Sequence, residues 1–219
     1  MRFIVREQPK ERRRSSGQMR YEQDGRPTGA METWRVSCPM TGYEVLRVDL
    51  DAQDAPSGHS YLYHLVRQEN GRFERLGVRF WGSGITVEAT LIFDEQGITG
   101  TRTVNGITYP VDAPGGTFWF PSSIGLGLLA GVSSTETAVT LNTDLSEPTA
   151  AFAIRTVDIA TQWGDKTTLN TAGQAFAVRP FTIQWADQTR TLWLNEHNWP
   201  LKMARGDGLT AIETRYVRY

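Results

Sequence analysis

The chain has 219 residues, of which 39% are hydrophobic and 21% are charged, and its formal net charge at pH 7 is −1. This composition excludes a disordered chain, and the length suffices for a core without disulfide or metal support. The single cysteine, Cys38, excludes an internal disulfide framework and is typical of a reducing compartment. The apolar runs are too short for a signal peptide or a membrane-spanning helix, so we expect a cytoplasmic protein that is not transmembrane.

The first feature along the chain is a basic stretch. Residues 1–17 contain six Lys or Arg and two Glu, whereas the rest of the chain is net acidic. We expect a solvated basic loop at about residues 8–17, between the first two strands. The alternative is that residues 10–14 dock on a phosphate-bearing partner or on an acidic face of their own domain.

Turn sequences then divide the chain into strands. Asp24-Gly25, Asn70-Gly71 and Asn105-Gly106 each separate two runs of strand-forming residues. Such pairs favour hairpins with type I′ turns, because both residues tolerate positive φ. Further turns are predicted at residues 95–97, 196–198 and 206–208. This spacing is typical of an antiparallel meander and not of alternating βαβ units.

The runs between the turns alternate in hydrophobicity. Residues 85–93 carry an apolar side chain at every second position, and residues 181–186 repeat the pattern with Phe181, Ile183 and Trp185. This period of two predicts strands with one apolar face. We predict a single, mainly β domain over residues 1–219, made of long antiparallel strands.

One segment departs from the strand pattern. Residues 122–132 follow Phe118-Trp119-Phe120-Pro121 and predict a short helix with Ser122 or Ser123 as N-cap. The glycines in this segment disfavour helix, so an apolar loop is the alternative. The segment either lines or covers a pocket for an apolar ligand, or it plugs one open end or face of the sheet.

No motif for catalysis or metal binding is found in the sequence. His59 and His64 are five residues apart, so on one strand they face opposite sides and cannot chelate a metal together. His197 falls in a predicted turn, and the acidic run at residues 49–54 lacks the glycine and glutamate of a calcium loop. We therefore assign no catalytic residue, no metal and no cofactor.

Several short motifs together resemble one known family. They lie at residues 21–25, Gly29, 120–129, 190–194, 199–203 and 206–208. In that order they are similar to the first hairpin, the apolar segment and the closing strands of the bacterial half-barrel proteins related to the lipoprotein carriers LolA and LolB, uncharacterised members included. The resemblance implies a curved antiparallel half-barrel (β-clam) with a helical segment near 122–132. A closed lipocalin-like barrel or a β-sandwich is the alternative.

The resemblance also implies a ligand. We expect a non-enzymatic binding or carrier protein for a lipophilic small molecule, lipid or glycolipid-like, on the concave face of the sheet. The sequence departs from the pattern of the lipoprotein carriers, because we find no leader peptide, lipobox cysteine or second helix in it. We therefore expect a cytoplasmic relative of these carriers. The residues expected to line the site are chosen for size and position: Trp119, Phe120, Leu126, Leu129, Trp185, Trp193 and Met203.

Three other functions remain open. An enzyme acting on a hydrophobic substrate in the same cavity would need a general acid such as His64, Glu88 or Asp187. A structural or interaction module would use its aromatic side chains to contact another chain, for instance as a homodimer. Nucleic-acid binding through aromatic side chains and residues 12–14 is disfavoured, because the acidic body repels a polyanion.

Overall fold

The computed structural model describes residues 7, 9–53, 55, 58–132 and 135–219, and these form long strands with little helix. The first strands are β1 (Arg12–Gln23), β2 (Arg26–Cys38), β3 (Tyr43–Ala52), β4 (His59–Gln68), β5 (Phe73–Gly82), β6 (Ile85–Phe93), β7 (Ile98–Val104), β8 (Ile107–Ala113) and β9 (Thr117–Trp119). The later strands are β10 (Thr135–Leu141), β11 (Ile154–Trp163), β12 (Thr167–Thr171), β13 (Gln174–Trp185), β14 (Gln188–Leu194), β15 (Pro200–Arg205), β16 (Leu209–Glu213) and β17 (Val217–Arg218). The helical elements are α1 (Ser123–Gly127) and the short 3-10 turns η1 (Leu128–Gly131) and η2 (Pro148–Ala150).

The strands join into one sheet that grows in both directions from β1. On one side, β1 to β8 follow as consecutive antiparallel hairpins. On the other side come β16, β15, β14, β13, β11 and β10, all antiparallel, and β9 is added parallel to β10. The prediction of a mainly β, antiparallel fold is confirmed, and within the described residues the sheet does not close into a barrel.

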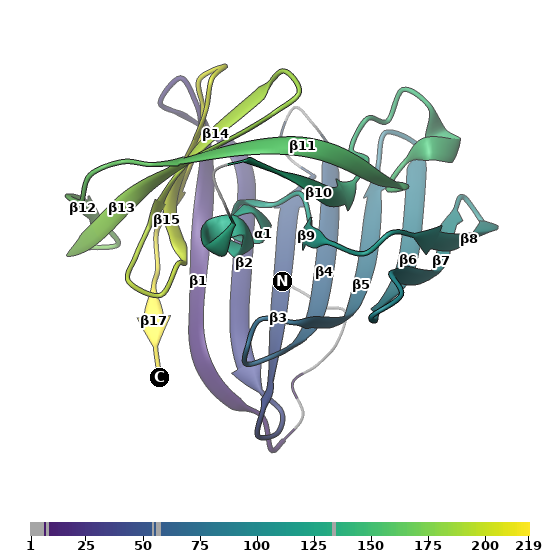
Figure 1. Ribbon diagram of the computed structural model, residues 1–219. Helices are drawn as coiled ribbons and strands as arrows, with labels where there is room; N and C mark the ends of the chain where they lie inside the picture. The colour runs from purple at the N-terminus through teal and green to yellow at the C-terminus, as the bar shows by residue number, and fades with distance from the viewer. Residues whose placement is uncertain (1–6, 8, 54, 56–57, 133–134) are drawn as a thin grey trace.

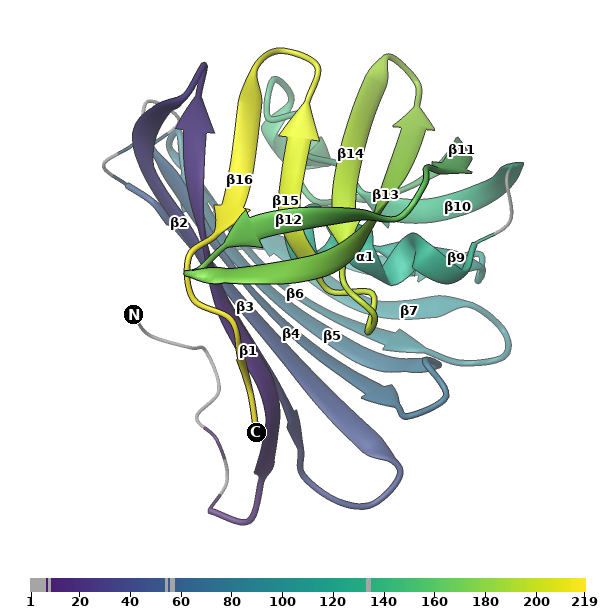
Figure 2. The same cartoon turned by 90° about the vertical axis from the view of Figure 1, so that its left-hand side faces the viewer.

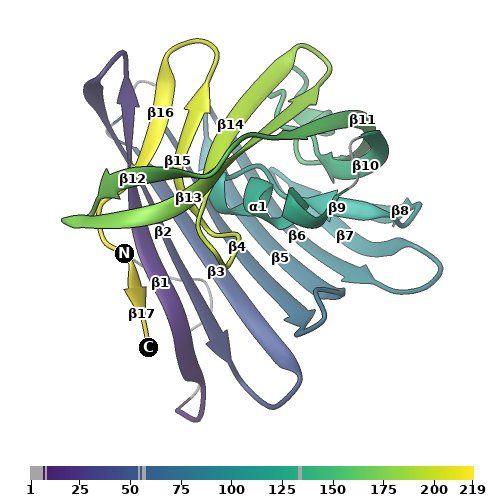
Figure 3. The same ribbon diagram turned by 60° about the vertical axis from the view of Figure 1, so that its left-hand side comes forward.

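Strong curvature brings the two halves of the sheet face to face. In Figure 1, β10, β11 and β13 cross in front of β1 to β6, with α1 between the two layers. Figures 2 and 3 show the same arrangement from the side, with α1 and β9 enclosed on the concave side of the long strands. The predicted curved half-barrel with one short helical segment is therefore confirmed, and the second half of its own sheet covers its concave face.

Local turn chemistry explains the hairpins. Asp24-Gly25 has φ values of 50° and 75°, and Asn105-Gly106 has values of 47° and 85°, as a type I′ turn requires. Asn70-Gly71 also joins two strands, but positive φ occurs only at Gly71. There the side chain of Asn70 accepts a hydrogen bond from the backbone N–H of Arg72 at 2.9 Å, which stabilises a wider turn.

The basic stretch differs from the predicted loop. A strand, β1, begins at Arg12, and its first residues pair with Ser37 and Cys38 of β2. The charge run misled the prediction because the carboxylate partners of Arg14 lie elsewhere in the sequence: Arg14 forms ion pairs with both Glu44 and Glu69. Once paired, these arginines can lie on a sheet instead of in a solvated loop. Residue 8 lies outside the described residues.

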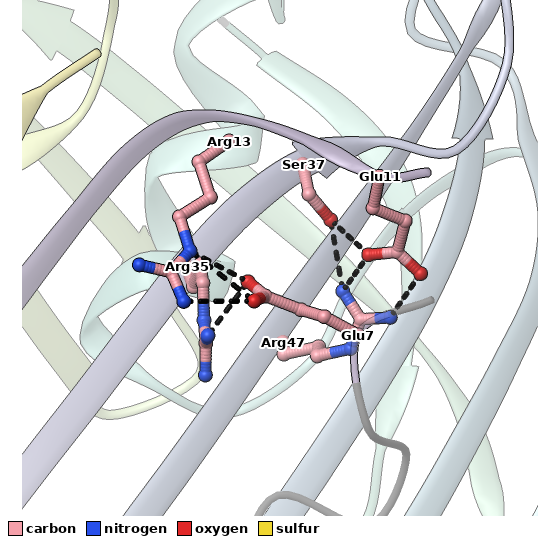
Figure 4. Close-up of polar contacts among 6 residues, drawn as sticks. All are labelled: Glu7, Glu11, Arg13, Arg35, Ser37 and Arg47. Atoms are coloured by element: carbon pink, nitrogen blue, oxygen red, sulfur yellow. Dashed lines mark hydrogen bonds and ion pairs between the residues drawn. The ribbon is translucent and has the colours of Figure 1, made fainter. Parts of the chain in front are cut away.

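A buried ion pair lies on the outer face of the sheet, opposite the core. Arg47 and Glu11 are each 2% exposed, and their charged groups approach to 2.9 Å. The hydroxyl of Ser37 donates to Glu11 at 2.7 Å and lies 2.9 Å from Arg47 Nη1, which completes a three-residue network (Figure 4). Glu11, which precedes β1, thus reaches back over the outer face of β2 and β3.

Candidate functional site

Six of the seven residues expected to line a ligand site meet in one buried apolar cluster between the two halves of the sheet. They are Trp119, Phe120, Leu126, Leu129, Trp185 and Met203, each at most 9% exposed. Trp193 lies apart from them: Leu192 and Leu194 of the same strand are buried, whereas Trp193 is half-buried and packs under the ammonium group of Lys202, 4.7 Å from its ring centre. Their role in binding a ligand stays a prediction.

Residues 120–131, here called the plug, occupy the concave side of the sheet. Ser122 is the N-cap of α1, as predicted, and its side chain accepts from the N–H of Gly125 at 2.8 Å. The two glycines that disfavour helix are needed for close packing. A Cβ on Gly125 would lie 2.0 Å from the carbonyl oxygen of Phe120, and one on Gly127 would lie 2.9 Å from Pro200. The plug can therefore sit tight against its own chain and β15.

A buried carboxyl group ties the plug to the sheet. Glu32 of β2 is fully buried, and it accepts hydrogen bonds from the N–H groups of Ser123 and Ile124 at 3.3 and 3.1 Å. The hydroxyl of Tyr21 donates to Glu32 at 2.6 Å and lies 2.8 Å from the hydroxyl of Ser123. This network, together with the neighbouring Tyr61 and Tyr63, is called the Glu32 cluster below.

Tyr63 carries an unsatisfied polar group into this cluster. Its ring packs 4.5 Å from that of Phe120 and 4.9 Å from that of Tyr61. Its hydroxyl is buried and has no hydrogen-bond partner among the described residues. A buried hydroxyl without a partner costs about 1–3 kcal/mol, so such groups are rare and mark sites where another molecule can supply the missing bond.

Burial dominates the electrostatics of the Glu32 cluster. Burial raises the pKa of Glu32, and this outweighs the hydrogen bonds from Tyr21 and the plug that favour the charged form. Burial, followed by the nearby charge of Glu32, also raises the pKa of Tyr63 well above its usual range. Because burying a charge here is costly, the cluster suits a neutral polar group better than an ion.

The acids considered from sequence lie outside this cluster. His64 faces the outer side, beside Arg47 in the register of β3 and β4. Glu88 is exposed and pairs with Arg79 at 3.2 Å, and Asp187 is exposed in the turn between β13 and β14. Sequence reasoning missed Glu32, although a signal existed. In β2 the inward positions are Ala30, Glu32, Trp34 and Val36, so a carboxyl group occupies a core position of an alternating strand.

Two other buried groups titrate away from their usual range and have opposite effects. Burial, and then the charges of Arg47 and Arg75, lower the pKa of His64 to about 4. Burial raises the pKa of Glu213 to about 7, although the indole N–H of Trp34 donates to it at 3.0 Å. Between about pH 4 and 6.5, His64 is protonated to a greater extent in the unfolded chain than in the folded chain. Between 4.5 and about 7, Glu213 is protonated to a greater extent in the folded chain than in the unfolded chain.

These shifts predict opposite pH slopes. His64 makes the free energy of unfolding rise with pH up to 6.5, and Glu213, with Glu32 acting in the same sense, makes it fall as pH rises through about 7. The shifts of His64 and Glu213 each correspond to about 3 kcal/mol. Urea unfolding between about pH 5 and 8 should show a steeper decline for His64→Gln than for the parent chain, and a shallower one for Glu213→Gln. Parallel curves for all three proteins would refute these protonation states.

The described residues provide no group of three or more His, Cys, Asp or Glu side chains that could hold a metal ion. None of the helices in the described part of the chain is long and apolar enough to cross a membrane.

Comparison with known proteins finds similarity in structure but not in sequence. No protein-family model matches the chain, and no curated protein sequence matches it. A β-barrel-like protein of the domain of unknown function DUF1849 from Brucella abortus is similar in structure, with a TM-score of 0.54 and 12% identity over 94% of this chain and 98% of that one. A candidate lipoprotein from Parabacteroides distasonis aligns over 94% and 96% of the two chains, with 5% identity and a TM-score of 0.36. The first likeness supports a β-barrel-like fold, and neither establishes kinship with LolA or LolB.

Proposed function

We propose that the protein is a non-enzymatic carrier that binds a lipophilic small molecule with a neutral polar head on the concave face of its sheet. The observation that carries this proposal is the buried hydroxyl of Tyr63, which has no hydrogen-bond partner among the described residues and is near enough to Glu32 for the charge of Glu32 to raise its pKa. A ligand with an apolar body and a hydroxyl or carbonyl head would complete the hydrogen bonding of this cluster. Its body would take the place of plug side chains such as Phe120 and Leu129.

The attachment of the plug makes this exchange physically reasonable. Through Ser123 and Ile124, its first turn is hydrogen-bonded to the single carboxyl group of Glu32. A ligand head that binds Glu32 and Tyr63 competes directly with these bonds. The apolar contacts that the plug gives up are replaced by contacts with the ligand body, so the net cost is small.

The motif resemblance supports the same ligand class. In the half-barrel proteins related to LolA and LolB, a lipid-like molecule is held on the concave side, where this chain has its plug. We propose that this chain is a functional relative of that group, with a lipid or glycolipid-like ligand and a smaller binding space. The seven residues expected from sequence then divide into three groups. Trp119, Trp185 and Met203 line the space for the ligand body, Phe120, Leu126 and Leu129 belong to the plug that the body replaces, and Trp193 does not contact the ligand.

The test uses Nile red as a neutral, apolar fluorescent probe and decan-1-ol and decanoate as competitors. We expect saturable binding of Nile red to detergent-free protein, displacement by decan-1-ol, and much weaker displacement by decanoate at about pH 8, because burying its charge at the Glu32 cluster is costly. Tyr63→Phe should weaken the affinity for decan-1-ol by about fivefold to tenfold, because it removes the hydroxyl that binds the ligand head. Tyr43→Phe, at the start of β3 and outside the cluster, is the matched control. Absence of saturable Nile red binding would overturn the proposal.

The Glu32 cluster also favours a second candidate, an enzyme acting on a hydrophobic substrate. A carboxyl group with a raised pKa, hydrogen-bonded to Tyr21, has the character of a general acid. Native mass spectrometry of protein purified without detergent separates the two candidates. A carrier retains one apolar molecule of unchanged mass on incubation, whereas an enzyme converts it, and Glu32→Gln would stop the conversion without preventing retention.

A further inference from the structure

A second site lies on the opposite side of β1 from the plug. A cleft of about 180 Å³ opens between β1, β2 and the closing segment 214–219. Three arginines, Arg13, Arg35 and Arg215, line it together with the hydroxyl groups of Thr33 and Tyr219. Such a grouping of guanidinium and hydroxyl donors is suited to an oxyanion.

The floor of the cleft is fixed by close packing. Trp34 forms part of it and donates its indole N–H to Glu213 at 3.0 Å. Gly17 allows β1 to press against this pair, because a Cβ there would lie 2.4 Å from both Glu213 Oε2 and Trp34 Nε1. The arginines above therefore project from a rigid base, which favours a defined ligand geometry over a diffuse charged surface.

A carboxylate of the same chain already engages two of the arginines. In Figure 4, the carboxylate of Glu7 points at both Arg13 and Arg35, with distances of 3.0 Å to Arg13 Nη2 and 2.6 Å to Arg35 Nη1. Burial works to raise the pKa of Glu7, but the hydrogen bond and charge of Arg13 and Arg35 outweigh it and lower the pKa. Two guanidinium groups thus satisfy one monoanion, and this contact shows the geometry in which they hold an oxyanion.

Arg215, the third arginine of the cleft, does not pair with Glu7. It is exposed and makes no ion pair with any other residue that the structure describes. Arg13 and Arg35 share one carboxylate, and Arg215 adds a third positive charge to the lining of the cleft. A ligand with two negative charges and at least three acceptor oxygens would use all three arginines, whereas a monocarboxylate would not.

We propose that this cleft binds a phosphate dianion, free or as the head of a phosphate monoester, and that Glu7 is a built-in competitor for it. The proposal does not depend on the concave-face site. Phosphate binding pulls Arg13 and Arg35 away from Glu7 and adds Arg215 as the third partner. Because these groups are partly exposed, the affinity falls as the salt concentration rises.

The test is calorimetric titration of the full chain with inorganic phosphate and with glycerol 3-phosphate. Glu7→Gln removes the competitor and should tighten binding by about tenfold. Adding Arg215→Gln to that variant should weaken binding again by about tenfold. The matched controls are Glu22→Gln and Arg20→Gln, which break an ion pair on the same strand away from the cleft and should leave phosphate affinity unchanged. Thermal unfolding checks that each variant is folded.

A further arm identifies where the phosphate comes from. Binding of free glycerol 3-phosphate by Glu7→Gln indicates a soluble monoester. Binding only to vesicles that contain phosphatidic acid, and not to pure phosphatidylcholine vesicles, indicates a lipid head group. The proposal is overturned if Glu7→Gln binds phosphate no better than the parent chain, if Arg215→Gln has no effect, or if acetate binds Glu7→Gln as tightly as phosphate does.

Discussion

Replacing Arg47 with methionine is expected to lower the free energy of unfolding by about 3–5 kcal/mol. The change leaves the carboxylate of Glu11, which is 2% exposed, without its charge partner. Arg47 offsets much of the desolvation cost of Glu11 through hydrogen bonds of 2.9 Å to both of its carboxylate oxygens, and the hydroxyl of Ser37 cannot supply the opposite charge that is lost. Urea unfolding monitored by circular dichroism measures the loss.

A double variant separates the buried charge from simple loss of packing. Arg47→Met combined with Glu11→Leu removes both charges and should recover most of the lost stability. Arg79→Met is the matched control, since Arg79 pairs with Glu88 on an exposed strand surface at 3.2 Å, and its loss should cost less than about 1 kcal/mol. If the double variant were as unstable as Arg47→Met alone, the buried-charge explanation would be wrong.

Replacing Glu32 with alanine is expected to cost about 3–5 kcal/mol, because it leaves several buried donors without an acceptor. These are the N–H groups of Ser123 and Ile124 and, in part, the hydroxyl of Tyr21, which keeps Ser123 as a partner. Glu32→Gln keeps one oxygen for the plug and should lose less than half as much. Denaturant unfolding gives both values.

A local readout shows whether Glu32 holds the plug. In Glu32→Ala, the amides of Ser123 and Ile124 should exchange with deuterium much faster than in the parent chain, while the amides of β4 stay protected. Uniformly faster exchange through the whole sheet would instead indicate that Glu32 stabilises the fold in general and does not specifically retain the plug.

Local chemistry made much of the fold predictable from sequence. Asp24-Gly25 and Asn105-Gly106 fix their hairpins through φ values that few other residues adopt. The period of two in residues 85–93 gives buried Ile85, Val87, Ala89 and Leu91, with the residues between them exposed. The position and N-cap of α1 followed from Ser122 and the apolar run after it. Each of these signals lies within a few neighbouring residues.

Features that depend on distant partners were not predictable in the same way. The strand that begins at Arg12 requires carboxylates from distant parts of the chain, such as Glu44 of β3 and Glu69 in the turn after β4, to neutralise Arg14. The coiling of β9 to β11 over the concave face depends on contacts between halves of the chain far apart in sequence. Most of the expected lining residues do meet, but the polar centre of the site, Glu32 with Tyr63, was overlooked because carboxyl groups at core positions are rare.

The measurement that tests the central claim most directly is amide hydrogen exchange across residues 120–131 with and without decan-1-ol. If the ligand head binds Glu32 and Tyr63, the bonds from Ser123 and Ile124 to Glu32 must break, so their exchange should accelerate at the decan-1-ol concentrations that displace Nile red. Unchanged or slower exchange at these two amides, with decan-1-ol demonstrably bound, would contradict a site on the concave face.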